Sequence, residues 1–225
     1  MSSGFFITGT DTGVGKTMMT CALLHAFARR GRRVVGMKPV ASGAARDAGV
    51  LMSGDVMMLR FASNVDAPLH LVNPYCFEPP IAPHVAAERA GVTMDLAQIK
   101  RAYGELAAAA DLVMVEGVGG FCVPLGRGSD TSDLARELEL PVILVVGVRL
   151  GCLNHALLTA RAIREARLEL AGWIANRIDP AMVAAEESVR ALVERLAAPL
   201  LGDIGHAAHP EPREFAALLD LSRLG

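Results

Sequence analysis

The sequence predicts an α/β fold with a mostly parallel central β-sheet and helices on both faces. Short apolar runs alternate with longer amphipathic stretches, which is the pattern of βαβ units. Residues 141–148 contain no charged side chain, as expected for a central strand that is covered on both faces. A length of 225 residues is enough to bury a sizeable core, so one domain is expected over residues 1–225.

The expected elements follow in order along the chain. A buried strand over residues 5–8 leads through a glycine-rich turn into a helix over residues 16–30, which Gly31 ends. Further strands are expected over residues 33–37, 111–116, 141–148, 170–175 and 200–204, and further helices over 153–166, 182–196 and 214–221. Residues 44–81 are the least regular segment and carry many of the prolines.

The composition excludes several classes of protein. Hydrophobic residues make up 52% and charged residues 20% of the chain, which indicates a compact globular protein rather than a disordered one. A net charge of −2 gives no electrostatic reason to expect nucleic acid as a partner. Residues 140–148 are too few to cross a bilayer, and residues 1–4 lack the basic stretch of a signal peptide. The four scattered cysteines suit free thiols, so a cytoplasmic location is expected.

The most informative segment is the turn over residues 9–17, Gly-Thr-Asp-Thr-Gly-Val-Gly-Lys-Thr. A strand leads in and a helix leads out, which is the context of the phosphate-binding loop of a P-loop NTPase fold. Its glycines let backbone N–H groups curve around phosphate oxygens, and the helix N-terminus adds partial positive charge. Lys16 is expected to reach the β- and γ-phosphates of ATP, and the Thr17 hydroxyl to ligate Mg²⁺. Because the strict spacing places its first glycine where this chain has Thr10, a mere glycine-rich turn is the alternative.

Three more side chains have positions that suit phosphoryl transfer. Glu116 ends an apolar strand, where a P-loop site needs an acidic group for Mg²⁺, although it could be a surface glutamate in a turn. Lys38, at the end of the second strand, could neutralise charge on a migrating phosphoryl group, or could be a solvated surface lysine. Asp55 could be a second metal carboxylate, but its spacing alone favours the N-cap of the next helix.

Over nearly its whole length the sequence resembles the dethiobiotin synthetase family. The most specific motifs are Lys-Pro-Val-Ala-Ser-Gly at 38–43 and Leu-Gly-Cys-Leu-Asn-His-Ala at 150–156. The other matching segments are residues 9–17, 73–75, 81–84, 116–120, 141–148, 171–176 and 199–202. The resemblance implies one P-loop domain that works as a homodimer, with ATP, Mg²⁺, 7,8-diaminopelargonate and CO₂ or bicarbonate as its small-molecule partners. The implied reaction is ATP-driven closure of a cyclic urea, with neither nucleic acid nor a membrane involved.

The resemblance also implies roles for single residues. Lys16 and Lys38 would be catalytic, acting on the carbamate and the migrating phosphoryl group. Mg²⁺ would be held by Thr17, Asp55 and Glu116, which outweighs the capping interpretation of Asp55. Substrate contacts would come from Thr12, Ser42 and, across the dimer interface, from the helix start at Gly151, Cys152 and Asn154. The nucleotide would contact Gly13, Val14, Gly15, Lys16, Thr17, Asp55, Glu116, Gly117, Val118, Gly119, Asn176, Arg177, Gly205, His206 and Ala207, with Asn176 at the adenine edge.

The chain departs from the family pattern at three of these positions. Gly13 stands where some members carry an acidic side chain near the substrate amines. Val118 enlarges a position that alanine usually occupies beside the phosphate site. Gly205 replaces an expected proline, which bears on the adenine contacts and on nucleotide preference.

Other functions fit the sequence less well. A related P-loop ATPase that activates a carboxylate for amidation usually carries a glutaminase domain, and this chain has no cysteine in a nucleophile-elbow pattern. Nucleotide-switch ATPases that position septa or partition DNA place a lysine where this chain has Asp11. His206 and His209 could ligate a metal but lack further ligands nearby, and Cys152 suits a small packing residue better than a reactive thiol.

Overall fold

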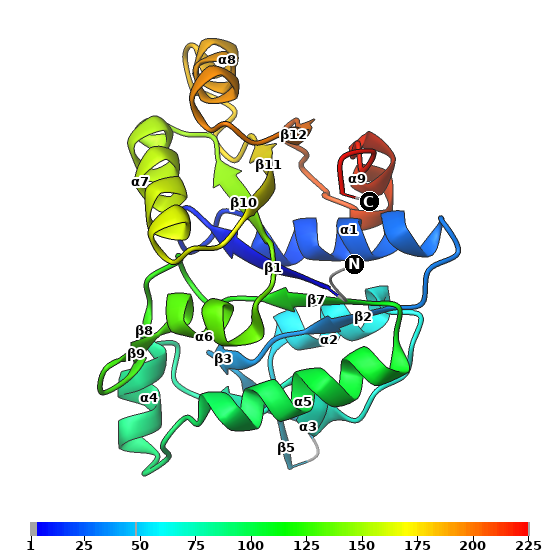
Figure 1. Ribbon diagram of the computed structural model, residues 1–225, viewed down its shortest axis with the longest axis vertical. Helices are drawn as coiled ribbons and strands as arrows, with labels where there is room; N and C mark the ends of the chain where they lie inside the picture. Colours follow the sequence, from blue (N-terminus) through cyan, green and yellow to red (C-terminus); the bar gives the residue numbers. More distant parts are fainter. Residues whose placement is uncertain (1–3, 48, 225) are drawn as a thin grey trace.

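The computed structural model describes residues 4–47 and 49–224. Its centre is a six-stranded sheet in which every neighbouring pair of strands is parallel, as predicted (Figure 1). The strands are, in sheet order, β12 (Leu200–Ile204), β11 (Leu170–Asn176), β10 (Val142–Gly147), β1 (Gly4–Gly9), β7 (Leu112–Glu116) and β2 (Val34–Met37). Because all six run the same way, their carboxyl ends lie along one edge, where such sheets bind ligands.

Alternating side chains of the central strands point into hydrophobic cores on both faces of the sheet. Phe5 and Ile7 of β1 pack with the helices of one face, whereas Phe6 between them packs into the core of the other face. β10 follows the same rule, with Val145 in the first core and Leu144 on the opposite side of the sheet. The sheet is therefore buried on both sides, which explains why its strands read as continuous apolar runs.

Helices cover both faces, with α1 and α9 on one side of the sheet and α5, α6 and α7 on the other (Figure 1). α1 is buried on most sides because α2 and α9 pack on its outer surface. The helices are α1 (Lys16–Ala28), α2 (Gly54–Ala62), α3 (Leu69–Val72), α4 (Pro83–Arg89), α5 (Leu96–Ala109), α6 (Thr131–Leu138), α7 (Cys152–Glu165), α8 (Ala185–Arg195), α9 (Pro212–Phe215) and the 3₁₀ turn η1 (Ala216–Leu218). The prediction of an α/β fold with both faces covered is confirmed.

Residues 44–81 contain more regular structure than their sequence indicates. They hold α2, α3 and part of two short ladders, which pair β3 (Val40–Ser42) with β6 (Tyr75–Phe77) and β4 (Ala45–Asp47) with β5 (Val50–Met52). A third ladder, β8 (Pro124–Gly126) with β9 (Ser129–Asp130), precedes α6. These strands have three residues or fewer, too short for a periodic pattern to reveal them.

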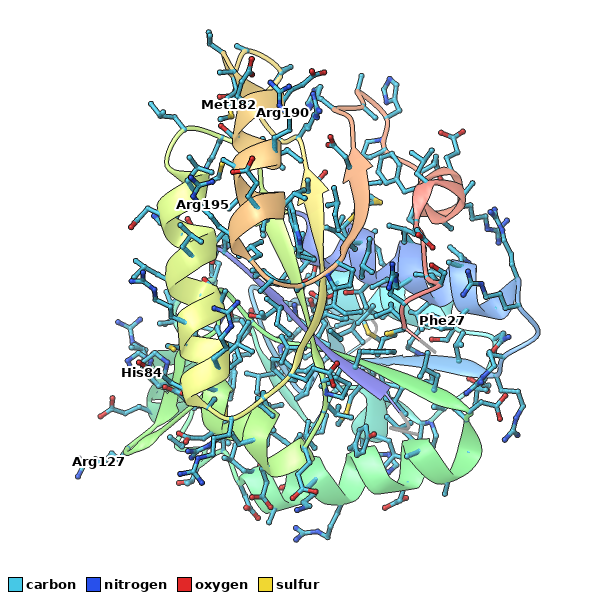
Figure 2. All side chains as sticks on the ribbon, turned by 45° about the horizontal axis from the view of Figure 1, so that its top comes forward. Phe27, His84, Arg127, Met182, Arg190 and Arg195 are labelled. Carbon is cyan, nitrogen blue, oxygen red and sulfur yellow. The ribbon has the colours of Figure 1, made fainter. Side chains whose placement is uncertain are left out.

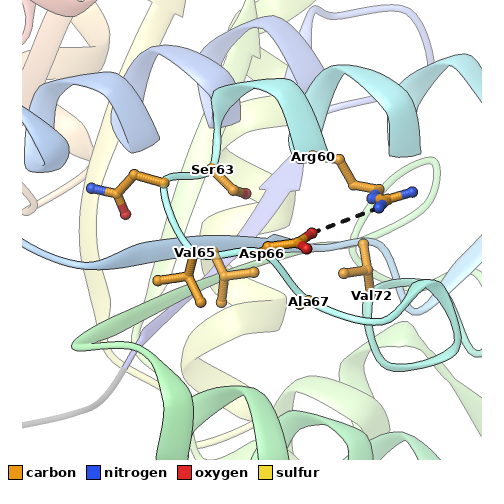
Figure 3. A pocket seen from close by; sticks show the side chains of 8 residues that line it. Arg60, Ser63, Val65, Asp66, Ala67 and Val72 are labelled. Carbon is orange, nitrogen blue, oxygen red and sulfur yellow. Dashed lines mark ion pairs between the residues drawn. The ribbon is translucent and has the colours of Figure 1, made fainter.

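The edge strand β2 is closed by side chains rather than by another strand. The Asn64 side-chain oxygen accepts from Val34 N at 2.7 Å, and the Ser63 hydroxyl accepts from Gly36 N at 2.9 Å. The same segment lines a small cavity of about 240 Å³, across which Arg60 and Asp66 form an ion pair (Figure 3). Since Ser63 and Asn64 already accept hydrogen bonds from the backbone of β2, this cavity belongs to the segment that covers the edge of the sheet.

Two predicted helices have different bounds in the structure. The C-terminal helix expected over residues 214–221 ends earlier than predicted, because α9 and η1 end at Leu218 and Leu219 is extended. Asp220 N then donates to Leu201 O at 2.7 Å, which draws the chain back to β12. The helix expected from residue 182 begins at Ala185, because Asp179 holds a preceding turn through Ala181 N and Met182 N.

None of the helices in the described part of the chain has the length and apolar character that crossing a bilayer requires. The prediction that no signal peptide is present concerns residues 1–4, of which residues 1–3 lie outside the described residues. All four cysteines are free thiols, as expected.

Candidate active site

The predicted phosphate loop lies between β1 and α1, as a P-loop requires. Gly13 and Gly15 both have positive φ, at 75° and 88°, so the loop needs glycine at these two points. A Cβ on Gly15 would also collide with the amide nitrogen of Asn176, which donates to Val14 O at 2.8 Å. The interpretation as a mere glycine-rich turn does not account for this context, because the loop ends on the N-terminus of a long buried helix.

Two lysines converge on the carboxyl end of the sheet. Lys16 begins α1, and its Nζ donates to Asp11 O in the loop at 2.9 Å. Lys38 follows β2, and its Nζ lies 2.5 Å from Glu116 Oε1 and 3.0 Å from Asp55 Oδ2. Lys38 is only 4% exposed, so the alternative of a solvated surface lysine is wrong.

The two carboxylates around Lys38 come from different elements, β7 and α2. Glu116 ends β7 and is 0% exposed, so it is not a surface glutamate in a turn. Asp55 lies in the first turn of α2, whose N-cap is Ser53, and its side chain turns inward to Lys38, so the capping interpretation is wrong. Thr17 donates its hydroxyl to Glu116 Oε1 at 2.8 Å, which completes the cluster.

The pKa values of the lysines differ because their surroundings differ. Burial, together with the positive charge of Lys38, lowers the pKa of Lys16 to about 8. Burial also disfavours the charged form of Lys38, but the charges of Glu116 and Asp55 outweigh it and raise the pKa of Lys38 above its ordinary value. Burial of Asp55 is outweighed in turn by the Lys38 ammonium, which lowers the pKa of Asp55. Both members of the Lys38–Asp55 pair are therefore charged at neutral pH.

The donor set around Thr17 suits a magnesium ion. The Thr17 hydroxyl, Asp55 and Glu116 offer hard oxygen ligands, and Mg²⁺ in P-loop sites takes few protein ligands besides phosphate and water. Within the described residues, Glu116 Oε2 is buried and accepts no hydrogen bond, so it retains capacity for a cation. No cluster of three His, Cys, Asp or Glu side chains occurs in the same part of the chain, so His206 and His209 form no metal cluster there.

A cleft of about 830 Å³ opens over the loop and the charged cluster. Apolar side chains from residues 80–83 line it together with charged and hydroxyl side chains. Its lining includes the predicted residues Thr12, Gly13, Gly15, Lys16, Thr17, Lys38, Ser42, Asp55, Glu116, Val118 and Gly119. No role at the site was predicted for the others, which are Asp11, Pro80, Ile81, Ala82, Pro83, Gly120 and Val123. The combination of apolar side chains with charged and hydroxyl groups suits a substrate that has a hydrocarbon portion and polar reacting groups.

The predicted adenine contacts lie outside this cleft, at the ends of β11 and β12. Asn176 ends β11 opposite Ile204, and its side chain reaches the phosphate loop at Val14 O. Arg177 is engaged by Asp203 through two hydrogen bonds of 2.9 and 2.7 Å, so its guanidinium braces the two strand ends. Gly205, His206 and Ala207 follow β12 directly. Val14 and Gly117 are on the loop and after β7 but do not line the cleft.

The predicted carboxylate contacts form a third group. Gly151, with φ of 94°, precedes α7, so these residues open a helix as expected. They do not line the cleft of their own chain. Cys152 is 2% exposed and packs in a core, which favours the interpretation as a packing residue, whereas Gly151 and Asn154 are exposed.

Another cavity, of about 450 Å³, lies between α4 and the β8–β9 hairpin. His84 and Arg127 line it, and Figure 2 shows both at one edge of the molecule, well away from Arg190 on α8. It holds none of the predicted site residues.

Known proteins resemble this chain in sequence and in fold. Residues 3–211 match the family described as an AAA domain. The ATP-dependent dethiobiotin synthetase of Nitrosospira multiformis is 54% identical over 225 residues, covering 100% of this chain and 98% of that protein. The protein of the same name from Aromatoleum aromaticum is 57% identical over 217 residues, covering 96% of each, and that from Janthinobacterium is 51% identical, covering 97% and 94%.

Solved structures share the fold at much lower identity. The MinD cell division protein of Aquifex aeolicus has a TM-score of 0.52 at 18% identity, covering 95% of this chain and 85% of that one. The signal recognition particle 54 kDa protein of Aeropyrum pernix has a TM-score of 0.51 at 18% identity, covering 99% of this chain and 46% of that one. These likenesses concern the P-loop fold, whereas the full-length relatives identify the family. The chain belongs to the ATP-dependent dethiobiotin synthetase family.

Proposed function

We propose that this chain closes the ureido ring of dethiobiotin from 7,8-diaminopelargonate, CO₂ and ATP. The observation that carries the proposal is the cluster of Lys16, Lys38, Asp55 and Glu116 at the end of a P-loop cleft that also has an apolar wall. Such a site can transfer a phosphoryl group to a small acceptor whose hydrocarbon portion lies against the wall. The relatives, which are more than half identical along almost the whole chain, bear the name of this activity.

The chemistry has three steps. One amine of the substrate adds to CO₂ and loses a proton, which gives a carbamate. A carbamate oxygen then attacks the γ-phosphorus of ATP, the bond to the bridging oxygen breaks, and ADP leaves with the bonding electrons. The second amine attacks the carbonyl carbon of this mixed anhydride, the carbon–oxygen bond breaks, and inorganic phosphate departs with a proton lost from the amine. Activation is required because an unactivated carbamate oxygen is a poor leaving group.

Lys16 and Lys38 are the proposed catalytic residues. Both side chains line the cleft, where fixed positive charge would stabilise a migrating phosphoryl group and the carbamate oxygens. Thr17, Asp55 and Glu116 would hold Mg²⁺, which when bound supplies positive charge to the phosphates of ATP. Glu116 and Asp55 also fix the Lys38 side chain, so Lys38 reaches the reacting atoms without rearranging.

Thr12 and Ser42 line the same cleft and are proposed to contact the diamine end of the substrate. The substrate carboxylate would reach Gly151, Cys152 and Asn154 of the second subunit of a homodimer. Two features support this part. The start of α7 does not line its own cleft, and the apolar side chains of Leu150, Leu153 and Leu158 beside it are exposed.

The adenine end of ATP is proposed to lie by Asn176 and the backbone of residues 205–207. The Asn176 amide nitrogen is engaged by Val14 O, so its oxygen is the atom available to accept from an amino group. Arg177 would act by holding Asp203 rather than by contacting the base. We further expect one P-loop domain, acting in the cytoplasm.

The first test is phosphate release from ATP and Mg²⁺, with and without 7,8-diaminopelargonate and bicarbonate, with mass detection of the product. Release that depends on the diamine, with a product carrying the carbonyl bridge, is the expected result. Turnover of ATP that is indifferent to the diamine would contradict the ligase and leave the P-loop assignment standing.

Two substitutions test the site itself. Lys38→Ala is expected to lower ring closure by several orders of magnitude, and near wild-type turnover would remove Lys38 from the mechanism. Leu158→Glu, on the exposed face of α7, is expected to weaken the dimer and raise the apparent KM for the diamine. Leu218→Glu is the matched control, since Leu218 is equally exposed on η1. An unchanged KM in a proven monomer would refute the shared site.

A further inference from the structure

The charges that line the cleft do not balance by themselves. Asp11, Asp55 and Glu116 supply three carboxylates, whereas Lys16 and Lys38 supply only two ammonium groups. A site for a nucleotide polyanion gains from net positive charge, so an uncompensated carboxylate at its mouth would oppose binding. The compensation comes from Arg149, which lies outside the cleft lining in the turn between β10 and α7.

Arg149 engages the carboxylate of Asp11 directly. Its Nη2 lies 2.5 Å from Asp11 Oδ2, while Asp11 Oδ1 accepts from Thr12 N at 2.8 Å. The carbonyl of Asp11 accepts from Lys16 Nζ at 2.9 Å. The residue that Arg149 holds is therefore also bonded to the catalytic lysine of the loop.

The backbone of Arg149 is tied to the opposite end of the same turn. Its carbonyl accepts from Cys152 N at 3.0 Å, at the first residue of α7. Arg149 thus connects the phosphate loop to the start of α7, although Asp11 and Arg149 are 138 residues apart in the sequence. Both side chains are nearly half exposed, and such pairs contribute little to stability, so the effect of Arg149 is on the loop's charge and orientation.

We propose that Arg149 is a positioning residue for nucleotide binding, which neutralises Asp11 and holds its carboxylate away from the phosphates. This role makes the two halves of the ion pair unequal. Removing Arg149 leaves a negative charge beside the phosphate site, whereas removing the charge of Asp11 leaves a positive one. A pair that only braced the loop would give the same loss from either side.

The test measures the Kd of MgATP by calorimetry in the absence of the diamine, so it does not depend on ring closure. Arg149→Met is expected to weaken binding about tenfold, since a like charge near the phosphates is only partly screened there. Arg149→Lys should recover most of the affinity. Asp11→Asn alone should bind at least as tightly as wild type, and Asp11→Asn with Arg149→Met should return to within about threefold of wild type.

Arg136→Met is the matched control, because Arg136 pairs with Asp133 at the same 2.5 Å on α6, outside the cleft. It is expected to leave the Kd unchanged. The proposal is overturned if Arg149→Met binds MgATP within twofold of wild type, or if the double variant is as weak as Arg149→Met. Thermal unfolding of each variant, expected within about 2 °C of wild type, separates these outcomes from loss of the fold.

Discussion

Replacing Lys38 by methionine should destabilise the protein far more than replacing an exposed lysine. Lys38 lies 2.5 Å from Glu116, and their side chains are 5% and 0% exposed, so methionine would leave the Glu116 carboxylate buried beside Asp55. Removing one partner of a buried pair costs about 3–5 kcal/mol, because the remaining charge is uncompensated. An unfolding entropy of about 2.1 cal/mol/K per residue amounts to roughly 0.5 kcal/mol/K for 225 residues. The melting temperature should therefore fall by about 6–10 °C.

The assay is thermal unfolding followed by circular dichroism at pH 7 without divalent cations. Lys100→Met is the matched control, because Lys100 pairs with Glu137 at 3.0 Å but both side chains are about half exposed. Such a pair contributes about 0–1 kcal/mol, so the control should shift by about 2 °C or less. Adding Glu116→Gln to Lys38→Met should recover part of the loss, since the isolated carboxylate is then gone. A Lys38→Met variant that melts no lower than Lys100→Met would refute the reasoning.

The other predictions concern ligands at the same cleft. The pKa of Lys16 is about 8 against an ordinary 10.5, so the free protein loses the Lys16 charge as pH rises through 8. The Kd of ADP in EDTA should therefore rise about tenfold from pH 7 to 9. Lys16→Arg should abolish this pH dependence, and a flat profile for the wild type would contradict the prediction. Glu116→Gln should weaken Mn²⁺ binding in the presence of ADP more than tenfold, as measured by electron paramagnetic resonance. The Kd of ADP alone should stay within about threefold of the wild-type value. An unchanged Mn²⁺ affinity would exclude Glu116 as a ligand. Asn176→Ala removes the bond to Val14 O, so the KM for ATP should rise about fivefold to tenfold with kcat little changed, and an unchanged KM would separate Asn176 from the nucleotide.

Much of the fold and part of the site follow from local sequence pattern. The parallel strands are long apolar runs, and their carboxyl ends must gather along one edge, which is why Glu116 and Lys38 could be assigned to a shared site before any contact was known. The phosphate loop could be predicted equally well from the sequence, because its glycines, lysine and threonine have a fixed order between a strand and a helix. These predictions depend only on where a residue falls along its own element.

Features that depend on how distant segments pack could not be predicted in this way. The spacing of Asp55 along the chain favours a helix cap, whereas the packing of α2 against α1 and β2 places its side chain at Lys38. The Arg149–Asp11 pair joins segments whose separation along the chain gives no periodic signal. The C-terminal helix is shorter than predicted for the same reason, because Asp220 N donates to Leu201 O and not to a carbonyl within a helix. Tertiary hydrogen bonds override local preference at each of these points.

The pairing of charges explains why removing a positive residue and neutralising Asp11 should change nucleotide affinity in opposite directions. Lys16 and Lys38 are matched by Asp55 and Glu116, and Asp11 is matched by Arg149, so the cleft and its partner side chain sum to no net charge. Binding of a polyanion then depends on the directed loop N–H groups and the Lys16 ammonium, and not on an overall positive potential in the cleft. Loss of either lysine or of Arg149 leaves excess negative charge and should weaken nucleotide binding, whereas neutralising Asp11 leaves excess positive charge and should not. Because the charges balance, the direction in which nucleotide affinity changes on removing a charged side chain should report the sign of its charge.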